Sequence, residues 1–167
     1  MEGFNTKERQ EGFARRIPKT SLQKSVLEIK RVSRTTKKKR EFSFGALTLV
    51  KDETKRAVNF AYAKGQEASG AIRKSSKKAA KKLTTYFVDP PRTISRDIMV
   101  KYKSTKILLK PAPAGTGISA GSVLGKLFKF LGIKDVSAKI IGSRNKLNVI
   151  KGAFKILEII RKKQCNI

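Results

Sequence analysis

The sequence predicts an α+β protein made of two small domains. Within residues 21–84, three segments with alternating apolar and polar residues are followed by one segment with helical spacing. The pair Pro90-Pro91 then interrupts the chain, because neither proline donates a backbone hydrogen bond and each restricts the residue before it. Residues 92–160 combine further strand patterns with two apolar helical stripes, which predicts a two-layer α/β domain.

The first domain is expected to have the element order β-β-β-α. Its strands are predicted at residues 26–32, 42–50 and 58–63, and polar turns at residues 35–40 and 51–55 connect them. From Ser69 the apolar spacing changes to three or four residues, and one helix face is formed by Ile72, Ser75 or Ser76, Ala79 and Leu83. A sheet covered by a helix on one face can leave its other face to a ligand.

The second domain is expected to contain three strands and two helices. The strands are predicted at Ile94–Tyr102, Ile107–Lys110 and Val136–Ile141, with a turn at residues 103–106. A loop at residues 111–117 leads to a helix that Gly132 can end and whose apolar stripe is Ile118, Val123, Leu124, Leu127, Phe128 and Leu131. Asn145 or Asn148 caps the last helix, whose apolar face is Leu147, Ile150, Phe154, Leu157 and Ile160. We expect both helices on one side of the sheet.

The charge of the chain points to a polyanionic partner. Forty Lys and Arg residues stand against 12 Asp and Glu, giving a net charge of +28, so a folded body of this size repels itself unless anions surround it. Basic residues occur in every quarter of the chain and not on one amphipathic helix, which favours nucleic acid over a membrane surface. A membrane-surface polycation is the weaker alternative. Lysine outnumbers arginine, which points to a source with an AT-rich genome.

Several classes of chemistry are excluded by composition. The chain has no histidine and one cysteine, Cys165, which excludes disulfides, zinc fingers and catalysis by histidine or a Cys–His pair. The glycine-rich segment 115–121 does not fit a nucleotide-binding loop, since Gly125-Lys126 is followed by Leu127 where a P-loop needs Ser or Thr. We predict no catalytic residue, metal, cofactor or small-molecule substrate. The protein is not expected to be an enzyme.

Two runs of cations are candidate phosphate contacts. Lys37–Arg40 lies at the tip of the first predicted hairpin, and six cations lie between Arg73 and Lys82 with no acid among them. Charge runs are ordinarily solvated surface, but adjacent cations repel one another unless an anion meets them. For the four aromatic residues of the strands, alternation favours core packing against the helix over a base-stacking platform; these residues are Phe42, Phe44, Phe60 and Tyr62.

A set of motifs runs through residues 21–160. The carboxy-terminal half contains the segment 111–121, PAPAGTGISAG, followed by Ala138-Lys139 and Gly142-Ser143. The amino-terminal half contains Arg31-Val32-Ser33, Arg40, Phe42-Ser43-Phe44, Arg56 and Ala71-Ile72-Arg73-Lys74. Together these motifs resemble the family of ribosomal protein five of the bacterial small subunit, most sharply in the segment 111–121. The chain departs from the family in having Lys38-Lys39 at the first hairpin tip, and few glycines around the second turn, where the family has glycines.

The resemblance implies a structural constituent of the small ribosomal subunit. Such a protein would bind small-subunit ribosomal RNA where head meets body and support assembly and translational fidelity. Its residues 21–84 would resemble a double-stranded-RNA-binding fold, and residues 92–160 would contain a left-handed crossover. Residues 1–20 are expected to be a flexible basic extension and residues 161–167 a tail. A free double-stranded-RNA-binding regulatory protein is the alternative function.

The resemblance also assigns candidate sites and partners. The RNA-binding residues are expected to be Arg31, Arg34, Thr36, Lys37, Lys38, Lys39, Arg40, Arg56, Lys64, Arg73, Lys74 and Lys77. Ribosomal proteins four and eight of the small subunit are the expected protein partners. The interface towards protein four would contain Gly115, Thr116, Gly117, Gly121, Gly125 and Lys126. The expected location is the cytoplasmic ribosome of a bacterium or the ribosome of an organelle, with no membrane association.

Overall fold

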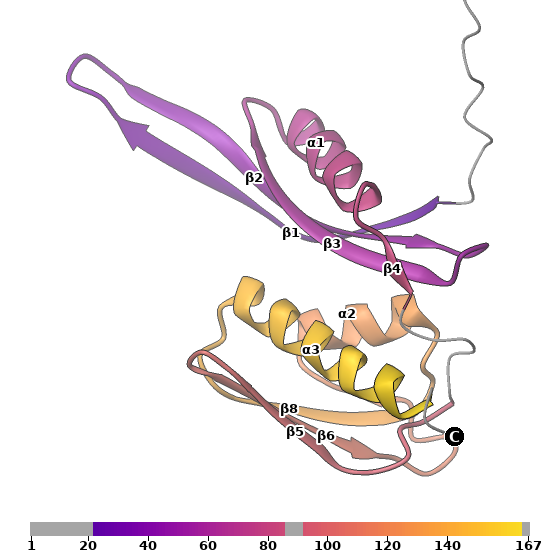
Figure 1. The fold of residues 1–167 in the computed structure, drawn as a ribbon. Coiled ribbons are helices and arrows are strands. Elements are labelled where there is room, and N and C mark those ends of the chain that lie inside the picture. The colour runs from indigo at the N-terminus through magenta and orange to yellow at the C-terminus, as the bar shows by residue number, and fades with distance from the viewer. Residues whose placement is uncertain (1–21, 86–91, 165–167) are drawn as a thin grey trace, which may run out of the picture.

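The computed structural model describes residues 22–85 and 92–164, and these residues form four stacked layers (Figure 1). Helix α1 (Ala68–Ala80) covers one face of a first sheet, and helices α2 (Ser122–Leu131) and α3 (Lys146–Gln164) cover its other face. A second sheet lies on the far side of α2 and α3. The predicted α+β fold is therefore confirmed, with a β-β-β-α unit followed by a sheet carrying two helices. The expected extension at residues 1–20 lies outside the described residues.

The first sheet is antiparallel and has the strand order β1-β2-β3-β4. Its strands are Leu22–Thr35 (β1), Arg40–Asp52 (β2), Ala57–Gly65 (β3) and Thr84–Thr85 (β4). The three predicted strands are confirmed, and each is longer than its apolar pattern because backbone pairing continues into polar residues. The sequence contains no signal for β4, since two threonines are too short a segment to show a period.

Helix α1 packs on the first sheet through small side chains. Its buried residues are Ala71, Ser75, Ser76 and Ala79. The hydroxyl of Thr48 in β2 donates a 2.9 Å hydrogen bond to Ser75 Oγ, which joins helix and sheet at a buried position. The predicted helix was too long at its end. It stops at Ala80, and Leu83 packs beyond it against Val50, Ala61 and Ala79.

The second sheet has the order β5-β6-β8-β7. Its strands are Ile98–Tyr102 (β5), Thr105–Pro111 (β6), Val136–Gly142 (β8) and Ile118–Ser119 (β7). Strands β5, β6 and β8 pair antiparallel, whereas β7 is parallel to β8. The predicted strand at Ile94–Tyr102 starts only at Ile98. The predicted turn at residues 103–106 is shorter than expected, because Thr105 already pairs with Tyr102.

Local signals place the ends of α2 and α3. Gly132 ends α2 with φ 92°, and its N–H donates to the Phe128 carbonyl, as its position predicted. Asn145, and not Asn148, caps α3, since its Oδ1 accepts a hydrogen bond from the N–H of Leu147 at 3.2 Å. The start of α2 was predicted wrongly. Ile118 belongs to strand β7 because its neighbour Gly117 takes φ 74° and accepts a hydrogen bond from the N–H of Val136.

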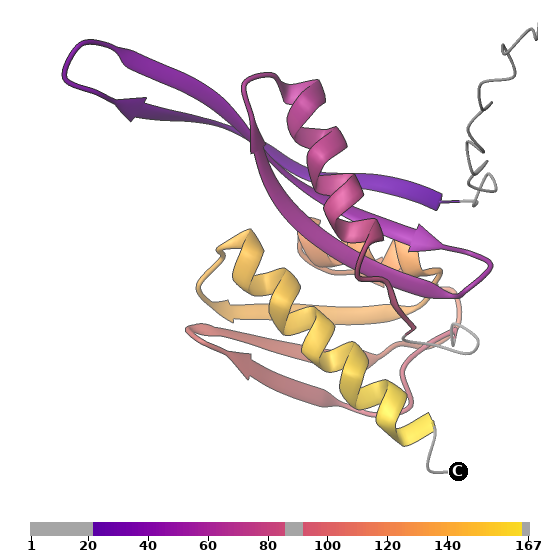
Figure 2. The ribbon, with the colours of Figure 1, turned by 45° about the horizontal axis from the view of Figure 1, so that its top comes forward.

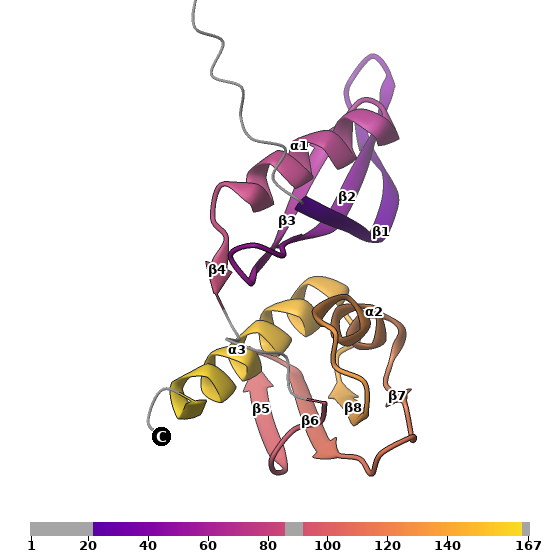
Figure 3. The same cartoon turned by 90° about the vertical axis from the view of Figure 1, so that its right-hand side faces the viewer.

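Helices α2 and α3 both lie on the same face of the second sheet, as expected (Figure 3). Gly152 allows α3 to approach this sheet closely, since a Cβ at Gly152 would lie 2.9 Å from Cδ1 of Ile107. Helix α3 reaches Gln164 and so includes the first part of the segment expected as a tail, whereas Cys165 lies outside the described residues. The left-handed sense of the β7-α2-β8 crossover stays a prediction.

One apolar core joins the two domains. Buried Leu47, Leu49 and Val58 of the first sheet belong to the same cluster as the buried side chains of α2 and α3. The rings of Phe60 and Phe154 meet edge to face with centroids 4.7 Å apart, and Lys146 Nζ lies 2.7 Å from Glu28 Oε1. The face of the first sheet that was expected to remain open to a ligand is therefore covered by α2 and α3.

This core corrects the assignment of two aromatic residues. Phe60 and Tyr62 were expected to pack against the helix of their own domain, but they pack against the cluster shared with the second domain. Alternation along a strand shows which residues share a face, but it does not show which neighbour covers that face. The helix α1 contacts the opposite face, where the smaller residues Val50 and Ala61 lie.

Candidate nucleic-acid interface

Strands β1 and β2 project beyond the sheet as a two-stranded arm, which comprises residues 31–43 (Figure 2). The arm stands free because β3 pairs with β2 only as far as Phe44, so the last part of the β1-β2 hairpin has no third strand beside it. It ends in a tight turn. The hydroxyl of Thr36 donates to the Lys39 carbonyl at 2.7 Å and accepts from the N–H of Lys39 at 3.3 Å. Thr36 therefore holds the turn that presents the lysines.

The turn at the tip of the arm forms without glycine, since Lys38-Lys39 stand there. Among the described residues other than glycine, a positive φ occurs at Arg56 (48°) and Lys103 (51°), so the turn at Thr36–Lys39 does not need one. The second turn, after Asp52, does need one and takes it at Arg56. Oδ1 of the buried Asp52 accepts from the N–H of Thr54 at 3.0 Å and so fixes that turn.

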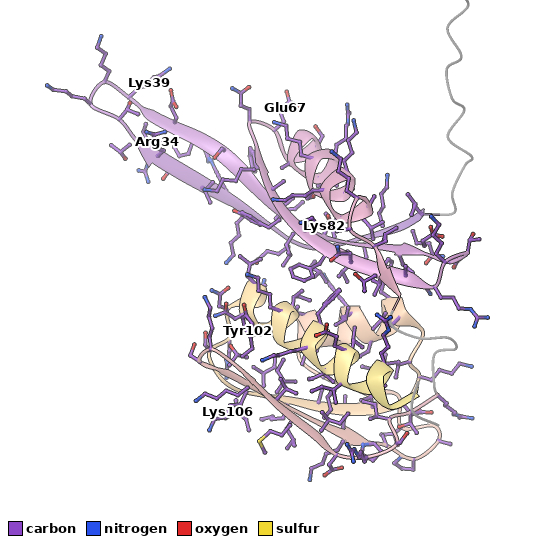
Figure 4. The ribbon with its side chains drawn as sticks, viewed as in Figure 1. Arg34, Lys39, Glu67, Lys82, Tyr102 and Lys106 are labelled. Atoms are coloured by element: carbon purple, nitrogen blue, oxygen red, sulfur yellow. The ribbon has the colours of Figure 1, made fainter. Side chains whose placement is uncertain are left out.

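The arm carries positive charge that its own residues barely neutralise. Its exposed cations are Arg31, Arg34, Lys37, Lys38, Lys39 and Arg40. Figure 4 shows Arg34 and Lys39 projecting from the arm, away from the rest of the protein. Lys39 Nζ lies 3.2 Å from Glu41 Oε1, and exposed pairs of this kind contribute little. The tip therefore presents a concentrated positive potential to the surroundings.

Phe42 lies on one face of the arm between two guanidinium groups. Cζ of Arg31 is 3.8 Å from the centroid of the Phe42 ring, and Cζ of Arg40 is 5.5 Å from it. Phe42 is 47% exposed, so its predicted packing against the helix is wrong. The alternation of the strand continues past the last residue that α1 covers. The stacking alternative fits Phe42 alone among the four aromatic residues, because an exposed ring flanked by arginines can take a nucleotide base.

The remaining predicted RNA-binding residues lie in two other places. Arg73, Lys74 and Lys77 are exposed on the outer face of α1, and Lys64 is exposed near the end of β3. Arg56 lies in the turn at the opposite end of β2 from the arm. Because β2 has 13 residues at about 3.3 Å each, roughly 40 Å separate Arg56 from the tip. The structure thus groups the arm cations with one another but not with Arg56.

A buried carboxylate organises the glycine-rich loop of the second domain. Gly115 and Gly117 have φ values of 93° and 74°. Oδ1 of Asp135 accepts hydrogen bonds from both of their N–H groups, at 3.1 and 2.9 Å, and its Oδ2 accepts from Arg92 Nε at 2.9 Å. Asp135 is 3% exposed. The sequence contains no signal for this role, since a single acid before a strand forms no pattern.

The expected protein-partner residues are only partly brought together. Gly115 and Thr116 are exposed in the loop, and the Thr116 hydroxyl donates to the Pro113 carbonyl at 2.9 Å. Gly121 is the N-cap of α2, where a Cβ would lie 3.1 Å from Cδ1 of Ile140. Gly125 lies on α2 one turn later, and its neighbour Lys126 lines a separate hollow beside β1.

The Asp135 contacts predict a loss of stability in acid. The hydrogen bond from Arg92, with those from Gly117 and Gly115, holds the pKa of Asp135 below its usual value of about 4, although burial opposes this shift. A carboxylate whose pKa is lower in the folded than in the unfolded protein stabilises the fold at pH values above its unfolded-state pKa. This stabilisation is lost as the pH falls from about 4 through the folded-state pKa. We expect the melting temperature to fall over this pH range.

Asp135→Asn supplies the control for this prediction. The variant should melt at a lower temperature near neutral pH and lose less stability on acidification than the original protein. Melting temperatures followed by circular dichroism between pH 6 and pH 2.5, about the range in which carboxylates titrate, provide the measurement. Identical pH profiles for the two proteins would contradict the role of Asp135.

The described part of the chain contains neither a metal site nor a membrane-spanning helix. No group of three or more His, Cys, Asp or Glu side chains there could hold a metal ion. None of the helices within residues 22–85 and 92–164 is long and apolar enough to cross a membrane.

Comparison with known proteins finds matches in both halves of the chain. Residues 22–85 match the family model of the ribosomal protein S5 N-terminal domain, and residues 100–166 match that of the ribosomal protein S5 C-terminal domain. The small ribosomal subunit protein uS5 of Chlamydia trachomatis serovar D is 40% identical over 136 residues, which is 81% of this chain and 82% of that protein. The small ribosomal subunit protein uS5 of Protochlamydia amoebophila is 39% identical over 139 residues, which is 83% of this chain and 82% of that protein. The one in a Bradyrhizobium strain is 36% identical over 93% of this chain and 78% of its own length.

Proposed function

The chain belongs to the ribosomal protein S5 family, and we propose that its arm binds small-subunit ribosomal RNA at the junction of head and body. It is a structural, non-enzymatic protein of the small subunit of a bacterial-type ribosome, and its partners are ribosomal RNA and ribosomal proteins. One observation carries the proposal for the arm. Exposed cations crowd its tip with one weak ion pair among them, next to an exposed phenylalanine between two arginines.

The arm is suited to bind RNA by phosphate contacts and stacking. The lysines of the tip can each neutralise a phosphate, which releases condensed counterions and fixes the position of the protein without reading sequence. Phe42 is 47% exposed and Arg31 stacks over its ring, so the ring and the guanidinium can together form a stack with an unpaired base. The outer face of α1, with Arg73, Lys74 and Lys77, provides a second row of cations that can follow a phosphate backbone. Lys64 and Arg56, at the two ends of β3, are proposed as further phosphate contacts outside the arm.

The glycine-rich loop is proposed as the contact with a neighbouring ribosomal protein. Asp135, itself bonded to Arg92, holds the backbone at Gly115 and Gly117 on either side of Thr116, so a partner meets a preformed surface. Gly121 follows at the start of α2. Proteins four and eight of the small subunit are the proposed partners. Contacts here would influence translational fidelity, and the arm would support assembly. We place the protein in the ribosome of a bacterial cytoplasm or of an organelle.

Sedimentation of a cell extract through a sucrose gradient in high salt tests this function. The protein, followed by immunoblot, is expected to sediment with the small subunit, because extensive phosphate contacts and protein neighbours hold an integral component in place. Recovery at the top of the gradient would contradict integral membership. In that case, tight binding to an isolated RNA duplex would support the free double-stranded-RNA-binding regulator instead.

A further inference from the structure

A hollow of about 610 Å³ lies between the two domains, beside the start of β1. Four of its nine lining residues are lysines, namely Lys24, Lys51, Lys126 and Lys129, and none is acidic. The first two belong to the first sheet and the other two to α2, so both domains contribute. We call this hollow the lysine groove.

The register of the strands and the helix explains why these lysines meet. Lys51 pairs with Gln23 and lies on the same face of β2 as Leu47 and Leu49, the face that packs towards α2 and α3. Lys126 and Lys129 are three residues apart on α2 and therefore lie on one side of that helix. Lys24 differs from the other three, because it pairs with Val50 on the face of the sheet towards α1; it borders the groove as part of β1, the edge strand.

The acids nearest in the sequence have other partners. Asp52 follows Lys51 but points to the opposite face of the sheet, where it is 1% exposed and accepts hydrogen bonds from the turn. Glu53 accepts a 2.7 Å hydrogen bond from Nε2 of Gln23. The ion pairs found among the described residues include none of the four groove lysines. Lys129 also complements the dipole in the last turn of α2, but Lys51 and Lys126 have no such role.

We infer that the lysine groove binds backbone phosphates of RNA and thereby ties the two domains to one RNA segment. Like charges gathered in one hollow repel one another, and an anion that enters it removes this repulsion. Ammonium groups neutralise phosphates without reading bases, and Gln23 and Ser25 supply polar atoms beside them. Lys126, which the resemblance assigns to the protein-partner interface, is by this inference an RNA contact. The inference rests on the proposed ribosomal RNA binding.

The groove is a site separate from the arm. Strand β1 starts at the groove, at Leu22, and ends at the arm, at Thr35. Its 14 residues at about 3.3 Å each place the two sites roughly 40 Å apart. Phosphate contacts in the groove should therefore add to those of the arm and not replace them.

The test compares two triple variants of the full chain with equal net charge. The groove variant is Lys51→Gln with Lys126→Gln and Lys129→Gln. The matched control is Lys101→Gln with Lys106→Gln and Lys110→Gln, three exposed lysines on the outer face of the second sheet; Lys106 is labelled in Figure 4. The probe is transcribed bacterial small-subunit ribosomal RNA. Binding is measured at several salt concentrations, and circular dichroism checks that both variants fold.

The groove variant is expected to lower the log–log salt slope by about two units, at about 0.7–0.9 per lost phosphate contact, and the control by less than about one. Arginine at the same three positions should restore the slope. An unchanged slope for the groove variant, or equal decreases in the two variants, would overturn the inference. The proposed function would still stand in that case, as long as the original protein bound the ribosomal RNA. If the original protein bound no ribosomal RNA, the proposed function itself would fail.

Acetylation of lysines with an amine-reactive reagent, read by mass spectrometry, identifies the occupant. Lys51, Lys126 and Lys129 should be protected by the RNA, whereas Lys101 and Lys106 should not be. Protection by vesicles of anionic phospholipid, or by a ribosomal protein in the absence of RNA, without protection by RNA would overturn the assignment.

Discussion

Alanine at Lys37, Lys38, Lys39 and Arg40 together is expected to weaken binding to small-subunit ribosomal RNA and to lower its salt slope by about three units. Each phosphate contact contributes about 0.7–0.9 units to the slope, so four contacts account for this change. A difference of three units corresponds to about a 60-fold change in relative affinity between 50 and 200 mM salt. The loss should occur without unfolding, because Thr36 remains to close the turn.

Filter binding over this salt range measures the effect. A matched control replaces four exposed lysines with alanine on the outer face of the second sheet, far from the arm: Lys101, Lys106, Lys110 and Lys139. The control has the same net charge as the tip variant, so it separates local phosphate contacts from the general attraction of a basic protein to RNA. Equal slopes for the tip variant and the original protein would rule out the tip as an RNA contact.

Phe154→Ala is expected to lower the free energy of unfolding by about 3–5 kcal/mol, the range found for removal of a buried phenylalanine side chain. Phe154 is 8% exposed and meets Phe60 of the first domain edge to face, with centroids 4.7 Å apart. The substitution would therefore leave a cavity between α3 and β3, and not one enclosed within the second domain. Urea unfolding followed by circular dichroism provides the measurement.

A double-mutant cycle with Phe60→Ala tests where this energy resides. The coupling free energy should be about 0.5–1.5 kcal/mol, the usual value for an aromatic pair. Met99→Ala is the control, because Met99 is 66% exposed and its removal should change stability by no more than about 0.5 kcal/mol. A loss below about 1 kcal/mol for Phe154→Ala would show that the two domains do not depend on this contact.

Features that depend on neighbouring residues in the sequence were predictable. The order of strands and helices follows from the spacing of apolar residues, as in the alternation of β2 and the stripe of α2. The end of α2 at Gly132 and the cap of α3 at Asn145 follow from the backbone preferences of those two residue types. The motif at residues 111–121 was sufficient to indicate the family, and the net charge of +28 indicated a polyanionic partner.

Only the tertiary structure decided which of these faces meet. Phe42 and Phe60 share the alternating pattern, yet Phe60 is packed against Phe154 while Phe42 is exposed, because α1 and β3 cover only part of the hairpin. Asp135 and the lysine groove likewise combine residues far apart in the chain. A sequence pattern records the local period of the backbone, whereas contacts between distant elements depend on how whole layers stack. That stacking is determined by the packing of the shared core and leaves no local signal in the sequence.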